Sequence, residues 1–160
     1  MIQKELNVHI GEVKIAKNGE LLKAILGSCV GIGIIWEERK ICGLAHCLLS
    51  VSPNKTFQIG GRFVDQAVPS LLAMMKIKSE NYSELQVVIA GGGNMTAPEK
   101  TPADELVGSA NFATALSEMK RLGIKPVFAE QAGKEGRNII LDSSNYTYSI
   151  EAIPRLGESA

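Results

Sequence analysis

The sequence holds few cysteines and histidines and has no excess of charge. It contains three cysteines and two histidines in 160 residues. An odd number of cysteines without a recognisable secretory leader argues against a disulfide framework and favours a reducing compartment, so we expect a cytoplasmic protein. Lysine plus arginine and aspartate plus glutamate both total 17. This balance gives no support to nucleic acid as a partner.

Long hydrophobic runs are also missing. No apolar span reaches the roughly 18 residues that a transmembrane helix needs, so we expect no direct insertion into a membrane. No internal repeat, linker or change in composition divides the chain. The hydrophobic content of 45% is that of an ordinary globular protein. We therefore predict a single domain over residues 1–160.

Two segments carry apolar residues at helical spacing. Residues 62–76, "RFVDQAVPSLLAMMK", and residues 109–123, "SANFATALSEMKRLG", each predict an amphipathic helix. Pro69 predicts a kink or a late start in the first. The second helix is expected to bury one apolar face made of Phe112, Ala113, Leu116, Met119 and Leu122.

Several shorter segments read as strands. Residues 6–15 alternate apolar and polar positions, and Asn18-Gly19 supplies a hairpin turn after them. The polar stretch 50–61 is long enough to be a functional flap. Further strands are predicted at 85–93, 125–130, 138–142 and 146–150. With two helices and roughly seven or eight strands, the predicted fold class is α+β, with mostly antiparallel sheets.

The stretch "LGSCVGIGIIWEERKICGLAHC", residues 26–47, predicts two strands joined by a polar turn. A two-residue loop at Glu37 and Glu38 would place Cys29 directly opposite His46. A four-residue loop over 37–40 is at least as well suited, because Glu-Glu is poor chemistry for a tight turn, and it would make the two residues diagonal neighbours on one face. A loop of three residues, or a bulge, would put them on opposite faces.

On the first two registers, Gly31 and Gly33 share the face of Cys29 and are expected to leave it open to a ligand. The opposing interpretation is a fully buried sheet in which Cys29 is an ordinary core cysteine.

Cys29 and His46 are the candidate catalytic pair. A thiolate is a competent nucleophile, and an adjacent imidazole can take the thiol proton and later return it to a leaving group. Backbone N–H groups near Ser28 could stabilise the oxyanion of an acyl transfer. Cys42, His46 and Cys47 could be pictured as metal ligands, but neighbouring strand residues point to opposite faces and no fourth ligand is evident, so no metal is expected.

The glycine run "AGGGNM", residues 90–95, follows a predicted strand. Backbone N–H groups in such loops can cradle a phosphate. The run lacks the lysine and the spacing of a nucleotide-binding loop, so a structural turn is the better interpretation and no cofactor is expected.

The ordered blocks "LGSCVGIGI", "KICGLAHCLL", "RFVDQAVPSLL", "IAGGGNM", "MKRLGIKPVFAE" and "GKEGRNIILD" together resemble the CheD family of chemoreceptor glutamine deamidases. The resemblance covers about residues 11–142. It implies β-sheets layered with two helices on one side, as in the catalytic domain of the cytotoxic necrotizing toxins. It also implies that Cys29 attacks a receptor glutamine amide, that His46 protonates the departing ammonia, and that water hydrolyses the thioester without a cofactor.

The same resemblance implies binding partners, and the sequence departs from the family pattern at one position. The substrates would be methyl-accepting chemotaxis receptors, and some members also bind the phosphatase CheC. The family usually carries a threonine six residues before the cysteine, where this chain has Lys23, which has no acceptor for the imidazole N–H. Either a backbone carbonyl orients His46, or activity is reduced or lost. One alternative function is therefore that of a catalytically weak adaptor, which binds either receptors or a CheC-type phosphatase. Another is that of a thiol hydrolase acting on a small amide.

Overall fold

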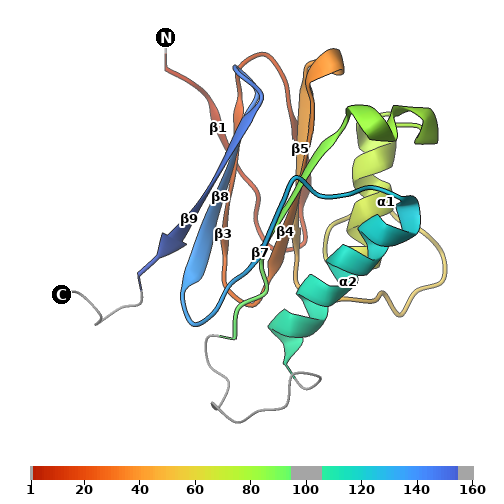
Figure 1. Ribbon diagram of the computed structural model, residues 1–160, viewed down its shortest axis with the longest axis vertical. Coiled ribbons are helices and arrows are strands. Elements are labelled where there is room, and N and C mark those ends of the chain that lie inside the picture. The colour runs from red at the N-terminus through yellow and green to blue at the C-terminus, as the bar shows by residue number, and fades with distance from the viewer. Residues whose placement is uncertain (1, 95–105, 155–160) are drawn as a thin grey trace.

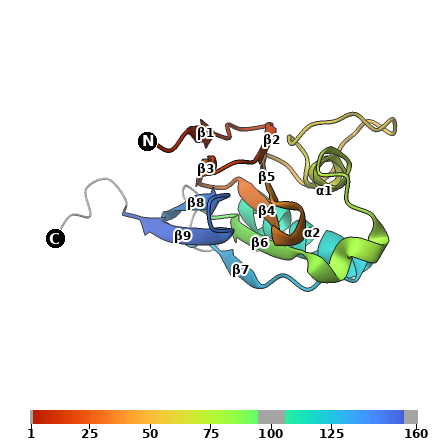
Figure 2. The same cartoon turned by 90° about the horizontal axis from the view of Figure 1, so that it is seen from above.

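The computed structural model describes residues 2–94 and 106–154 of the chain. Two β-sheets stack on each other, and two α-helices cover the outer face of one of them (Figure 1). Seen from above, the four-stranded sheet lies at the left and α1 at the right, with the five-stranded sheet between them (Figure 2). The predicted α+β architecture, with both helices on one side, is confirmed.

The two sheets contain nine strands in the described part of the chain. The four-stranded sheet has the order β1 (Glu5–Asn7), β3 (Leu21–Leu26), β8 (Gly136–Asp142) and β9 (Thr147–Ile153). The five-stranded sheet has the order β2 (Val13–Ala16), β5 (Ile41–Cys47), β4 (Val30–Trp36), β6 (Gln86–Gly91) and β7 (Phe128–Gln131). Neighbouring strands are antiparallel except for the β1–β3 and β6–β7 pairs, which are parallel.

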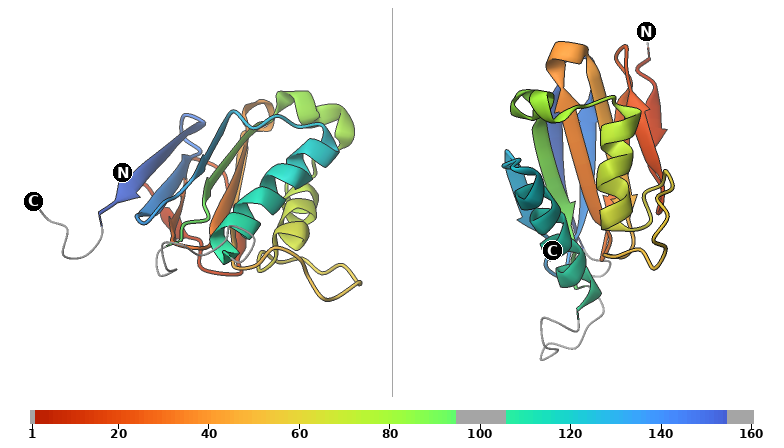
Figure 3. Two further views of the ribbon diagram at one scale, coloured as in Figure 1. Left: turned by 60° about the horizontal axis from the view of Figure 1, so that its bottom comes forward. Right: turned by 90° about the vertical axis from the view of Figure 1, so that its right-hand side faces the viewer.

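Helices α1 (Val64–Met74) and α2 (Val107–Leu122) lie on the same face of the five-stranded sheet, as both views of Figure 3 show. Pro69 lies inside α1, which starts at Val64, so the late start does not occur. Gly123 caps α2, because it adopts a left-handed conformation with φ 75° and its N–H donates to carbonyls of the last turn. Two short 3₁₀ helices, η1 (Glu37–Arg39) and η2 (Ser79–Glu84), precede β5 and β6.

The buried face of α2 is rotated about the helix axis by part of a turn from the predicted apolar face. Its buried side chains are Asn111, Phe112, Ala115 and Met119, together with Gly108. Leu116 is 38% exposed. The buried positions 111, 115 and 119 follow the i, i+4, i+8 spacing of one helix face, with an asparagine in a row that is otherwise apolar.

Every residue of β4 is buried, so the strand contributes to two hydrophobic clusters. Val30, Ile32, Ile34 and Trp36 pack toward the helices. Ile35 packs in the cluster between the two sheets, with Leu22, Leu26, Ile139 and Leu141 among its members. This double burial explains why β4 has a nearly continuous apolar sequence.

The glycine face of β4 is covered, not open as expected. A Cβ added to Gly31 would come within 2.9 Å of Leu26, and one added to Gly33 within 2.9 Å of Leu141. Both neighbours belong to the four-stranded sheet. Glycine therefore lets the second sheet approach closely, and the space is filled by protein.

The turn at Asn18-Gly19 forms, with φ 59° and 90°, but it does not join a hairpin pair. β2 pairs with β5, whereas β3 pairs with β1 and β8, so the turn carries the chain from one sheet to the other. The strands predicted at 138–142 and 146–150 form an antiparallel hairpin, β8 and β9. In the described ranges 2–94 and 106–154, no helix is long and apolar enough to cross a membrane.

Candidate active site

The ribbon of β4 and β5 has the register that a four-residue connection imposes. Val30 pairs with Cys47 and Gly31 with His46, and residues 37–40 connect the strands through η1. Lys40 completes the turn in a left-handed conformation with φ 56°. Cys29 lies just before β4, two residues from Gly31. The register of the four-residue alternative is therefore the correct one.

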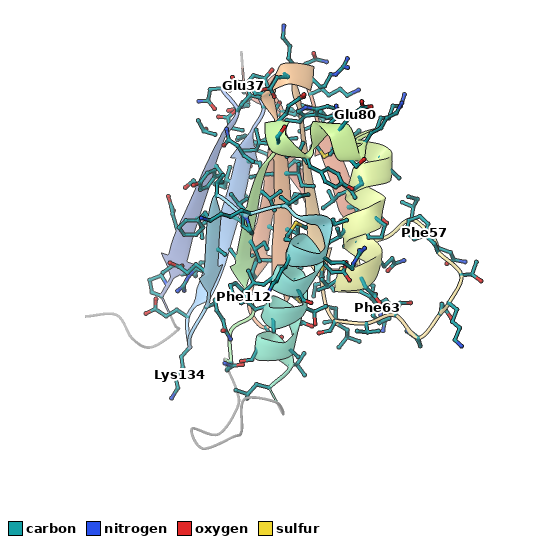
Figure 4. All side chains as sticks on the ribbon, turned by 45° about the vertical axis from the view of Figure 1, so that its right-hand side comes forward. Glu37, Phe57, Phe63, Glu80, Phe112 and Lys134 are labelled. Atoms are coloured by element: carbon teal, nitrogen blue, oxygen red, sulfur yellow. The ribbon has the colours of Figure 1, made fainter. Side chains whose placement is uncertain are left out.

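The site lies at the open end of this ribbon. Figure 4 shows Glu37 at the opposite end, beyond the tops of the strands, and Phe63 near the start of α1 at the site end. Residues 48–63 connect β5 to α1 and extend away from the body, with Phe57 on their outer part. Val51, Phe57 and Ile59 of this connection are all more than half exposed. The predicted flap is therefore a projecting loop beside the strand ends.

The His46 side chain is fixed by the segment that follows β1. Its Nδ1 lies 2.9 Å from the carbonyl oxygen of Val8. Its backbone N–H donates to the Glu12 carbonyl at 3.0 Å, and its own carbonyl accepts from Gly11 at 2.8 Å. Gly11 has φ 86°, a conformation that glycine adopts without strain. The ring and its backbone are therefore both held by residues 8–12.

The hydrogen bond to Val8 decides the tautomer of His46. A carbonyl oxygen can only accept, so Nδ1 carries the proton and Nε2 keeps its lone pair. Nε2 is buried and has no hydrogen-bond partner among the described residues. An unpaired buried nitrogen is costly, and such atoms often have a chemical role. His46 thus presents a neutral, basic nitrogen to the interior.

Burial lowers the pKa of His46, and the Val8 carbonyl partly opposes this shift. The charges of His9 and Glu12 act in opposite directions and are weaker causes. Lys23 does not contribute to the shift. The imidazole is consequently neutral at neutral pH.

Cys29 occupies a bend between β3 and β4 and is 6% exposed. Burial raises the pKa of its thiol, and no cation lowers it. Because Nε2 has no partner in the described structure, no hydrogen bond joins it to the Cys29 sulfur. At rest the thiol of Cys29 and the imidazole of His46 are therefore both neutral, and they are not a thiolate–imidazolium ion pair.

The glycine run after β6 supports the Cys29 bend. The N–H of Gly92 donates to the Cys29 carbonyl at 2.8 Å, and that of Gly93 donates to Gly27 at 2.9 Å. A Cβ on Gly91 would clash with the Cys29 carbonyl oxygen. The structural interpretation of residues 90–94 is therefore confirmed; Met95 lies outside the described residues.

Lys23 acts through its backbone. Its carbonyl accepts a hydrogen bond from Val8 N–H at 2.7 Å, which places the Val8 carbonyl in front of His46. On β3 it alternates with the buried residues Leu22 and Ala24, so its side chain projects from the outer face of the sheet. The acceptor for the imidazole is thus a main-chain carbonyl, the first of the two alternatives that the sequence left open.

A hollow of about 450 Å³ adjoins His46 between the end of β1 and β3. Its walls are mostly apolar, and the lining residues also include two basic residues, His9 and Lys23. The lining residues are Asn7, Val8, His9, Ile10, Lys23, Ala24, Ile25 and His46.

Asn111 of α2 is a site residue that the sequence did not single out. Its amide nitrogen donates to the carbonyls of Ser28 at 3.2 Å and Leu48 at 2.9 Å. Ser50 Oγ donates to its amide oxygen at 2.9 Å. Asn111 therefore joins the residue before Cys29 to the second residue after His46. The sequence feature that could have indicated Asn111 is its polar side chain on the same helix face as the apolar Ala115 and Met119.

The cysteines other than Cys29 are fully buried. Cys42 packs between the sheets and Cys47 packs toward the helices, so they lie on opposite faces of β5, as expected. Burial raises the pKa of Cys42 to about 12. Within the described residues, no three His, Cys, Asp or Glu side chains are grouped to hold a metal ion.

The chain is similar to proteins of one family. Residues 48–152 match the family described as CheD, chemotactic sensory transduction. A probable chemoreceptor glutamine deamidase CheD 2 from Ruegeria sp. is 44% identical, over 96% of this chain and 94% of that protein. Probable chemoreceptor glutamine deamidases CheD from Bdellovibrio bacteriovorus (36% identical; 97% and 99% covered) and Methanococcus vannielii (31%; 91% and 93%) are also similar.

Proposed function

Because the chain belongs to the CheD family, we propose that it is a protein-glutamine deamidase that converts specific glutamines of methyl-accepting chemotaxis receptors to glutamate in the cytoplasm. Cys29 is the nucleophile and His46 is the general base and acid. The observation that carries this assignment is the buried, unpaired Nε2 of His46, on a ring whose other nitrogen is held by Val8.

In the first half-reaction, Nε2 takes the proton from the Cys29 thiol as sulfur attacks the carbonyl carbon of the glutamine side chain. The tetrahedral intermediate then collapses. The C–N bond breaks, the nitrogen takes the proton from Nε2 and ammonia leaves, so that a thioester remains on Cys29. The Val8 carbonyl stabilises the imidazolium formed between these two proton transfers.

In the second half-reaction, Nε2 takes a proton from a water molecule that attacks the thioester carbon. The C–S bond breaks, the thiol is restored and the product is a glutamate side chain. Because the resting groups are both neutral, sulfur becomes strongly nucleophilic only when the proton moves to Nε2. Substrate binding must therefore bring Sγ and Nε2 into contact, as catalytic hydrogen bonds often tighten only in the complex.

The backbone N–H of Cys29 is the donor best placed for the oxyanion. It belongs to the same residue as the attacking sulfur, and it has no acceptor among residues 2–94 and 106–154. Removal of a single oxyanion-hole donor costs roughly 3–4 kcal/mol in a well-studied acyl-transfer enzyme. Ser28 supplies the other half of this peptide unit, which is the supporting role expected of it.

Lys23 does not prevent this chemistry. The family threonine would offer a hydroxyl acceptor to the imidazole, but here the Val8 carbonyl takes that place at 2.9 Å. Lys23 lines the hollow beside His46, but it is not among the groups that shift the pKa of His46.

The proposal is tested with cytoplasmic fragments of a chemoreceptor. Fragments incubated with the protein are digested, and each glutamine-containing peptide is examined by mass spectrometry for replacement of the amide by a carboxylate. The protein should modify particular glutamines, and Cys29→Ala and His46→Ala should modify none. Unmodified fragments after prolonged incubation with the native protein would refute the enzymatic assignment.

A second candidate function is that of an adaptor. Such an adaptor binds either receptors or a CheC-type phosphatase and acts by occupying its partner. Two features favour it: Cys29 is only 6% exposed, and no hydrogen bond joins its sulfur to His46 at rest. Receptor fragments that are bound but never modified would support the adaptor. In that case Cys29→Ala should bind receptors as well as the native protein does.

A further inference from the structure

Within the part of the chain that the structure describes, the side chain of Asn111 makes hydrogen bonds only to the two segments that carry the proposed catalytic residues. The side chain is 1% exposed, and its three hydrogen bonds reach Ser28, Leu48 and Ser50. Ser28 and Leu48 offer carbonyl oxygens, which cannot donate, so the amide nitrogen must face them and the amide oxygen must face the Ser50 hydroxyl. The orientation of this amide is therefore fixed by its partners.

The hydrogen bond to Ser28 also orients the backbone of Cys29. The Ser28 carbonyl and the Cys29 N–H belong to one peptide unit, which is planar and trans. In such a unit the N–H points away from the carbonyl. Because Asn111 holds the carbonyl on the side of α2, the Cys29 N–H is directed away from α2, and no described residue accepts its hydrogen.

Close packing keeps Asn111 in this place. A Cβ on Gly108, one turn earlier in α2, would clash with the carbonyl oxygens of Gly92 and Gly93. The same glycine run donates to the carbonyls of Cys29 and Gly27. The helix, the glycine run and the Cys29 bend are thus in direct contact, and a sideways shift of α2 would move the peptide unit.

We infer that Asn111 is a positioning residue that aims the Cys29 N–H at the oxyanion of the substrate. The inference rests on the proposed function, since it takes Cys29 to be acylated. It goes beyond that function by assigning to α2 a catalytic contribution that acts through the Ser28 carbonyl.

Two reactions of Cys29 separate this role from a general structural one. Acylation by p-nitrophenyl acetate passes through a tetrahedral oxyanion: the S–C bond forms, the ester C–O bond breaks and p-nitrophenolate leaves. Alkylation by iodoacetamide displaces iodide at a saturated carbon and forms no oxyanion. Both reactions need the same thiolate, so the ratio of their rates reports oxyanion stabilisation alone. Cys29→Ala supplies the background of each reaction.

Asn111→Asp keeps the shape and the acceptor for Ser50, and its ionised carboxylate has neither donor. It should lower the acylation rate about tenfold and leave alkylation within about twofold; the loss is smaller than that of an oxyanion donor itself because Asn111 only aims the donor. Asn111→Ala should act in the same direction, and it serves if the aspartate variant does not fold. Ser50→Ala, which spares both donors, should leave the ratio of rates unchanged.

Equal losses of acylation and alkylation in both Asn111 variants would overturn the inference, and so would no loss in either. Failure of native Cys29 to be acylated would overturn it as well. A native protein that is acylated but never modifies receptor fragments would refute the proposed function while leaving the role of Asn111 supported.

Discussion

The carbonyl oxygen of Val8 lies 2.9 Å from Nδ1 of His46, so a main-chain atom completes the site where the family usually has a threonine. The Val8 N–H is in turn bound to the Lys23 carbonyl at 2.7 Å. This chain of backbone hydrogen bonds depends on the positions of β1 and β3 and not on the side chain at position 23.

Replacing Lys23 by the family residue should therefore change little. We expect Lys23→Thr and Lys23→Ala to keep kcat/KM for receptor fragments within about threefold of the native value, because a partly exposed charge contributes little. Steady-state deamidation rates test this. A tenfold or larger gain in Lys23→Thr alone would show that a hydroxyl is needed and that the Val8 carbonyl is an insufficient acceptor.

The reactivity of Cys29 should increase steadily with pH. Burial raises the pKa of its thiol above 9.0, so the thiolate is a small fraction at neutral pH. The rate of alkylation by iodoacetamide should rise about tenfold per pH unit up to pH 9, without a plateau. Mass spectrometry of the labelled protein measures this rate. A plateau near neutral pH would indicate a resting thiolate–imidazolium pair, contrary to the neutral pair described above.

His46 should make stability depend on pH in a defined direction. Burial lowers its folded-state pKa below the ordinary value of 6.5, so the unfolded chain binds the proton more readily. Its contribution is complete above pH 6.5 and decreases as the pH falls toward the folded-state pKa. Urea midpoints between pH 8 and pH 5 should decrease more for the native protein than for His46→Asn. Parallel curves for the two proteins would contradict the shift.

The close approach of the two sheets predicts a sharp difference between two glycines. Gly33→Ala would place a Cβ 2.9 Å from side-chain atoms of Leu141 and Val88 and should cost about 1–3 kcal/mol of unfolding free energy. Gly133→Ala is the matched control, because nothing lies within 4 Å of its added Cβ. Urea denaturation compares the two. Equal stabilities would mean that the sheets can separate without cost at this point.

Local patterns were sufficient to predict both helices and most of the strands, but they left the register of the β4–β5 ribbon open between two-, three- and four-residue loops. The four-residue connection at residues 37–40 fixes the pairing of Gly31 with His46. The partner of β2 could not be predicted, because the Asn18-Gly19 turn reverses the chain without specifying which strand receives it. The cover over Gly33 comes from β8, more than 100 residues away.

The site was predictable only where it depends on side chains. Cys29 and His46 stood out because few other residues of the chain have their chemistry. Val8 contributes a carbonyl oxygen, which every residue possesses, so no sequence pattern could identify it. Asn111 is a polar residue on an otherwise apolar helix face, which is only a weak indication of a special role. This pattern does not identify its hydrogen-bond partners, which lie 61 to 83 residues away in the sequence.

In the proposed mechanism, Val8 keeps the proton on Nδ1 of His46, so that Nε2 is free to act as the base for Cys29. Nitrogen-15 NMR of histidine-labelled protein at neutral pH measures this directly, with His46→Asn to assign the signals. The hydrogen bond to the Val8 carbonyl predicts a protonated Nδ1 coupled to its hydrogen and an unprotonated Nε2. A resting His46 that carries its proton on Nε2, or on both nitrogens, would contradict it.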